Sequence, residues 1–74
     1  MARISVTHRG DGYRVRVRGE LAAGDLHRLE QACGRALERP QAPLELDLTA
    51  ATLVDEVAQT FVARLRARGA TLVS

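Results

Sequence analysis

The chain has 74 residues, with eleven arginines, no lysine and nine acidic residues, and its formal net charge is +2. This length predicts one small domain, and a composition of 46% hydrophobic and 27% charged residues is typical of a globular protein. The small net charge argues against a protein specialised for binding polyanions. A single cysteine excludes an internal disulfide, and without an apolar leader or a long apolar run we expect a cytoplasmic protein with no membrane span.

Two strands joined by a tight turn are predicted at the start of the chain. Ile4 and Val6 alternate with polar neighbours, and Asp11-Gly12 is a strong hairpin signal. The second strand has one apolar and one basic face, made by Tyr13, Val15 and Val17 and by Arg14, Arg16 and Arg18. We expect Gly19 to end this strand.

An amphipathic helix follows, opened by Asp25. Its apolar residues recur on one stripe: Leu26, Leu29, Ala32, Cys33, Ala36 and Leu37. We expect Cys33, inside this stripe, to be buried and unreactive. Pro40 and Pro43 bracket the exit of the helix.

A third strand is predicted over 44–48, with its leucines on one face and Glu45 and Asp47 on the other. These two acids are plausible cross-strand partners for the arginines. We expect 49–53 to form a turn. Asp55 and Glu56 should place negative charge at the start of a second helix over about 54–68, where acidic residues usually cap the helix. Its inward residues are predicted to be Val54, Val57, Ala58, Phe61, Val62 and Leu65.

Gly69 is suited to end the second helix, and 70–73 should form a short last strand. The order β-β-α-β-α-β predicts a two-layer α/β fold with a four-stranded mixed sheet. Because crossovers between parallel strands are right-handed, both helices should lie on one face of the sheet. The arginines would then lie on the other face, open to water.

The ordered pattern resembles the STAS domain family, the bacterial anti-sigma factor antagonists. The resemblance covers nearly the whole chain, through Val17-Arg18-Gly19-Glu20-Leu21, Leu46-Asp47-Leu48-Thr49 and Arg66-Ala67-Arg68-Gly69-Ala70. In that family a D-S-S-G motif follows the third strand, and its second serine is phosphorylated. Here the matching residues are Asp55, Glu56, Val57 and Ala58, so the phosphoacceptor position is Val57.

The resemblance implies a single STAS-like domain over 1–74, truncated before the family's terminal helix. It also implies a non-catalytic regulatory module that docks a protein partner without phosphorylation control. The partner would be an anti-sigma factor or similar kinase, or the ATPase subunit of an ABC transporter. The implied partner-binding residues are Thr49, Thr52, Asp55, Glu56 and Gln59. We expect the degenerate phosphosite Val57 to have joined the apolar stripe of its helix.

Other functions remain open at this stage. A shortened domain could serve assembly by forming a homodimer, and Arg14, Arg16 and Arg18 could follow a nucleic-acid backbone. The hydroxyls of Thr49, Thr52 and Thr60 lie near the loop but not at the switch position. No metal-ligand spacing, phosphate loop or catalytic constellation is present in the sequence, so we expect no metal, no cofactor and no enzymatic activity.

Overall fold

The computed structural model describes residues 1–38 and 43–74, apart from the side chains of Arg9 and Arg35. Pro40, one of the two prolines expected at the exit of the first helix, lies outside the described residues. None of the helices in the described ranges is both long and apolar enough to cross a membrane.

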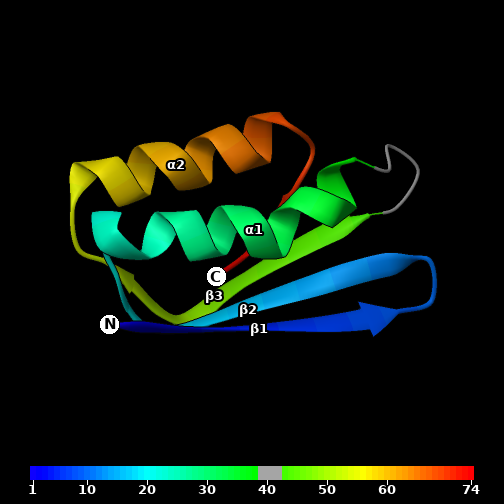
Figure 1. Cartoon of the computed structure of the whole chain (residues 1–74), viewed down its shortest axis with the longest axis horizontal. Helices are drawn as coiled ribbons and strands as arrows, with labels where there is room; N and C mark the ends of the chain where they lie inside the picture. The colour runs from blue at the N-terminus through cyan, green and yellow to red at the C-terminus, as the bar shows by residue number, and fades with distance from the viewer. Residues whose placement is uncertain (39–42) are drawn as a thin grey trace.

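The elements follow in the predicted order β-β-α-β-α-β. They are β1 (Ala2–Arg9), β2 (Gly12–Leu21), α1 (Leu26–Leu37), β3 (Leu44–Leu53), α2 (Glu56–Ala67) and β4 (Thr71–Val73). The sheet order is β1-β2-β3-β4, with β1 antiparallel to β2 and the other neighbours parallel. Both helices lie over the same side of the sheet (Figure 1). The predicted two-layer α/β architecture is therefore confirmed.

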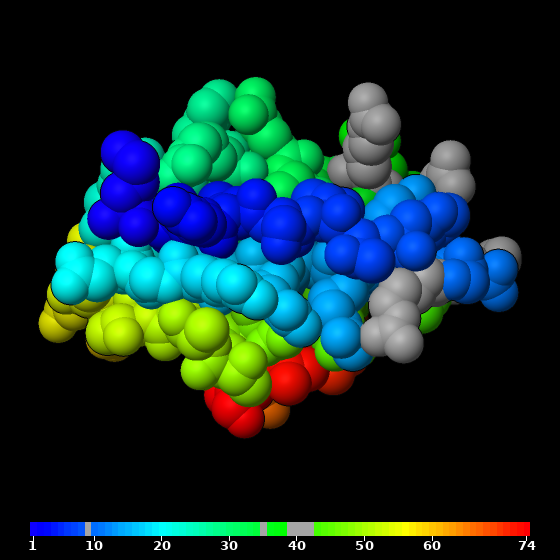
Figure 2. Space-filling view, turned by 90° about the horizontal axis from the view of Figure 1, so that it is seen from below, coloured from blue at the N-terminus to red at the C-terminus, as the bar shows by residue number. Residues whose placement is uncertain are grey.

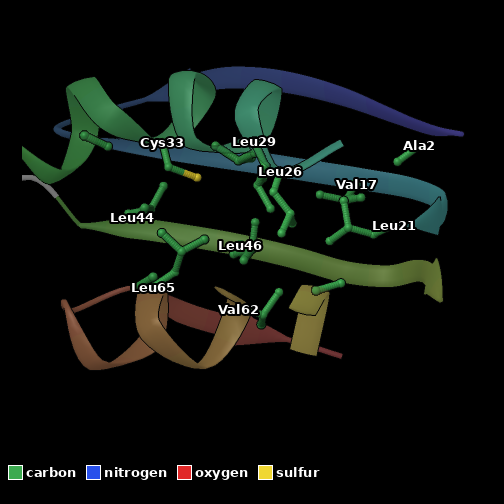
Figure 3. Close-up of a cluster of buried hydrophobic side chains, with 14 residues drawn as sticks. Ala2, Val17, Leu21, Leu26, Leu29, Cys33, Leu44, Leu46, Val62 and Leu65 are labelled. Atoms are coloured by element: carbon green, nitrogen blue, oxygen red, sulfur yellow. The ribbon is translucent and has the colours of Figure 1, made fainter. Parts of the chain in front are cut away.

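The hydrophobic core lies between this sheet and the two helices. Leu29 and Cys33 of α1 point toward Val17 and Leu46 on the sheet (Figure 3). The predicted stripe of α1 is confirmed, with Leu26, Leu29, Cys33 and Ala36 buried and Ala32 and Leu37 partly buried. From α2, the buried residues are Ala58, Val62 and Leu65. Each helix thus buries one stripe, as its sequence period requires.

Two predicted boundaries are wrong for a common reason. Gly19 does not end β2, because it pairs with Ala2 on β1 and Ala51 on β3 and the strand runs on to Leu21. Its left-handed φ of 88° is one that glycine adopts without a Cβ clash. The longer β2 offers backbone partners to 49–53, and this segment is therefore strand and not a turn. The pairing shifts between Arg16 opposite Asp47 and Arg18 opposite Ala50, so β3 carries one extra residue there. This bulge keeps the last leucines of the two strands in register.

Asp25 fastens the N-terminal strand to the start of α1. It closes a short 3-10 turn, Ala23–Asp25, and its carboxylate accepts hydrogen bonds from the amides of Ala22 at 3.1 Å and Ala2 at 3.5 Å. Arg28 pairs with the same carboxylate and donates to the Ala2 carbonyl at 3.0 Å. The Ala22 amide, followed by Arg28, holds the pKa of Asp25 below its ordinary value. Asp25, which was predicted to open the helix, thus also makes tertiary contacts that hold β1 against the start of α1.

Candidate functional site

The start of α2 is built on Asp55, which caps the helix as predicted. Its Oδ1 accepts a hydrogen bond from the Ala58 amide at 2.8 Å, and its Oδ2 accepts one from the Ala23 amide at 3.1 Å. The carboxylate therefore joins the start of α2 to the turn before α1. Because both oxygens are already engaged, Asp55 positions the site rather than offering a free charge.

Glu56 and Val57 at the start of α2 are exposed, and so is Val54 just before the helix. Val57 is 56% exposed and Val54 is 46% exposed, so the prediction that both point inward is wrong. For Val57 the physical reason is helical phase: Ala58, Val62 and Leu65 set the buried stripe, and each residue turns by about 100° from the last. Val57 is consequently carried away from the core. Val54 lies before the first residue of α2, so it does not belong to the helical stripe. Gln59 and Thr60 are exposed as well.

The two threonines of the predicted site lie on β3 and not in a loop. Thr52 is exposed opposite Glu20, on the sheet face that carries the arginines. Thr49 belongs to the bulge, where Asp47 Oδ1 accepts hydrogen bonds from its amide at 3.0 Å and its hydroxyl at 2.6 Å. The five predicted residues are thus split between two surfaces. Glu56 and Gln59 remain together on α2 beside the cap.

The bonds from Thr49 lower the pKa of Asp47 below its ordinary value, with the hydroxyl first, then the amide, and a smaller contribution from Arg16. A carboxylate with a lowered folded-state pKa contributes stability above its unfolded pKa and loses it as the pH falls through the folded value. We therefore expect Asp47→Asn to reduce the loss of stability as the pH falls from about 5 through the folded-state pKa of Asp47. Urea unfolding at a series of pH values measures this effect.

The matched control for this titration is Glu45→Gln, which removes the neighbouring carboxylate on the same strand but leaves the bulge intact. The acid-dependent loss should persist in that variant. Thr49→Val should raise the pKa of Asp47 toward the ordinary aspartate value, as followed by NMR titration. An unchanged Asp47 titration in Thr49→Val would contradict the assignment.

The arginine face of the sheet carries the predicted ion pairs. Arg14 contacts Glu45 at 2.9 Å and Arg16 contacts Asp47 at 3.3 Å, each pair in direct cross-strand register. Arg18 lies opposite Ala50 because the bulge shifts the register. Seen from below, the strands make up this face in the described part of the chain, and the helices lie behind them (Figure 2). Two of the three arginines are therefore already paired with carboxylates.

Cys33 is fully buried, and burial raises its thiol pKa to about 11. A thiol that ionises so weakly is a poor nucleophile at neutral pH, which agrees with the predicted packing role. Among the described residues, no group of three or more His, Cys, Asp or Glu side chains is placed to hold a metal ion.

One feature of this region was not predicted from the sequence. A shallow groove runs beside α2, lined by Leu26, Glu56, Val57, Thr60, Phe61 and Arg64. It joins the exposed edge of α2 to the first residue of α1. The signal was present as a second row of residues at helical spacing, offset from the buried stripe. Val57 was wrongly assigned to the core, whereas Phe61 is partly buried against it as predicted.

Comparison with known proteins extends the description of the fold. No protein-family model matches the chain, and no curated protein matches it. A solved structure described as "Crystal Structure Analysis of Mglu" is similar, with a TM-score of 0.69 and 22% sequence identity. The similarity covers 93% of this chain and 18% of that one, so the chain spans less than a fifth of that protein's length. At this identity the likeness shows a shared α/β fold alone.

Proposed function

We propose that the chain is a non-catalytic protein-interaction module that docks a partner through the end of β3 and the start of α2. The observation that carries the proposal is the exposure of Val54 and Val57 beside the Asp55 cap. Exposed apolar side chains next to a fixed helix start form a surface on which a partner can gain affinity by burying them. Glu56 adds a negative charge that favours a basic partner surface.

The resemblance to STAS domains supports a regulatory partner of the anti-sigma-factor kinase class. Val57 occupies the position that takes a phosphate in that family, and a valine has no hydroxyl to accept one. The exposure of Val57 supports a role in partner binding instead of a phosphorylation switch, because an exposed apolar side chain can be buried against a partner. Docking should therefore not depend on a phosphorylation state. An ABC-transporter ATPase is the second partner class to test.

The arginine face supports nucleic-acid binding less well. The guanidinium groups of Arg14 and Arg16 are engaged by Glu45 and Asp47, and these carboxylates would repel a phosphate backbone. We therefore place the docking surface at the start of α2.

The test uses purified anti-sigma-factor kinases encoded in the same genome, each titrated calorimetrically with the chain. Val54→Asp and Val57→Asp should each weaken binding at least ~10-fold, because each replaces an apolar contact with a carboxylate that loses its hydration in the interface. Val6→Asp is the matched control, since Val6 is 50% exposed but lies on β1, and it should leave affinity unchanged.

Incubation with kinase and ATP should neither phosphorylate the chain nor alter its affinity. Stoichiometric phosphorylation that changes binding would refute docking without a switch. If Val6→Asp, Val54→Asp and Val57→Asp bound the kinase with equal affinity, the start of α2 would not be the docking surface.

A further inference from the structure

The groove beside α2 combines an apolar floor with a charge at each end. Val57, Phe61 and Leu26 supply the apolar lining, while Glu56 and Arg64 lie at opposite ends of the α2 side. Phe61 is partly buried against the core, whereas Val57 is 56% exposed. An occupant that covers this apolar floor gains affinity if it also carries an opposite charge for each end.

The charges are arranged symmetrically about one residue. Glu56, Thr60 and Arg64 succeed one another at intervals of four residues, so they follow one row along α2. The two charged residues are about 12 Å apart along the helix axis, with Thr60 midway. Among the described side chains, neither Glu56 nor Arg64 belongs to an ion pair. Both charges are thus available to a partner.

Such a row is complementary to itself when reversed. If α2 of a second copy lies antiparallel across the first, with a two-fold axis at Thr60, Glu56 meets Arg64 of the second copy and Arg64 meets its Glu56. The same axis brings Val57 level with Ala63 of the second copy along the helix axis, and both residues are exposed. A parallel arrangement would bring like charges together. The charge pattern therefore selects one orientation.

We propose that a second copy of this chain docks on this face, with the two α2 helices antiparallel about a two-fold axis at Thr60. The dimer would cover Val57 and the groove, and it would exchange two Glu56–Arg64 ion pairs between copies. This inference goes beyond the proposed function and does not rest on it. Because Glu56 and Val57 serve both surfaces, self-association would compete with docking of another partner.

Charge reversal distinguishes this arrangement from other modes of association. Glu56→Arg and Arg64→Glu should each weaken the dimer at least ~10-fold, since each opposes like charges at both ends of the interface. An equimolar mixture of the two variants should restore association, because every facing pair is again opposite in sign. The double variant Glu56→Arg/Arg64→Glu should also dimerise. Sedimentation equilibrium at low salt measures all four samples.

A further variant leaves the charge row intact. In Thr60→Lys, the two lysines of a dimer would face each other at the two-fold axis and repel, so this variant should be monomeric. Gln31→Lys is the control: it adds the same charge on the exposed side of α1, away from the axis, and should still dimerise. Circular dichroism establishes that each variant is folded. A wild-type chain that stays monomeric up to millimolar concentration, or a mixture that fails to restore association, would overturn the proposal. Either result would leave the groove for a different protein.

Discussion

Leu46→Ala should unfold most of the protein under conditions where the wild type is native. Leu46 is fully buried on β3, between Val15 on β2 and Leu72 on β4, and it faces the helix layer (Figure 3). Truncating a buried leucine removes its transfer free energy and leaves a cavity, which together cost about 2–5 kcal/mol. A domain of this size rarely has more than ~3–5 kcal/mol of net stability. The loss is therefore comparable to the whole free energy of unfolding.

The measurement is urea unfolding followed by far-UV circular dichroism at a fixed protein concentration. Val6→Ala is the matched control, because it also removes methyl groups from a strand but from a side chain that is 50% exposed. Its expected effect is within ~0.5 kcal/mol. If Leu46→Ala and Val6→Ala lowered the free energy of unfolding by the same small amount, Leu46 would not be a tightly packed core residue.

The sequence predicted the fold well wherever apolar periodicity and a turn signal agreed. The alternation of β2 placed its valines in the core and its arginines on the other face with Glu45 and Asp47, where the structure has the pairs Arg14–Glu45 and Arg16–Asp47. The stripe of α1 and the cap at Asp55 were also correct. In these segments local preference and tertiary packing favour the same arrangement, so the single sequence is enough to predict the structure there.

The candidate site was predicted less well because tertiary contacts decided its details. Residues 49–53 have the small and polar composition of a turn, yet a neighbouring strand was available to pair with them. Likewise, Val57 is an ordinary core residue by type, but Ala58 is in phase with Val62 and Leu65 and takes the buried position. Neither the partner strand nor the helical phase can be read from the apolar pattern of the segment alone.

The same dependence on tertiary contact makes Gly12 the position where one added methyl group should do most harm. Gly12 is buried at the start of β2, and a Cβ atom there would lie 2.7 Å from the Pro43 carbonyl oxygen and 2.8 Å from Pro43 Cγ. That carbonyl accepts a hydrogen bond from the Tyr13 amide at 2.9 Å, which joins the hairpin to the residue before β3. Relieving the contact requires Pro43 to move and this bond to weaken.

We expect Gly12→Ala to cost about 1–3 kcal/mol, the usual range for overpacking at a tightly packed position. Gly34→Ala is the control, because it adds the same methyl group inside α1, where no described atom beyond the adjoining residues and the backbone of the same helix lies within 4 Å of the new Cβ. It should instead stabilise the protein by about 0.5–1 kcal/mol through the better helix propensity of alanine. Thermal unfolding measures both changes, and faster hydrogen exchange at the Tyr13 amide in Gly12→Ala would locate the damage. If the melting temperature shifted by the same amount and in the same direction in both variants, contact with Pro43 would not be the reason that position 12 requires glycine.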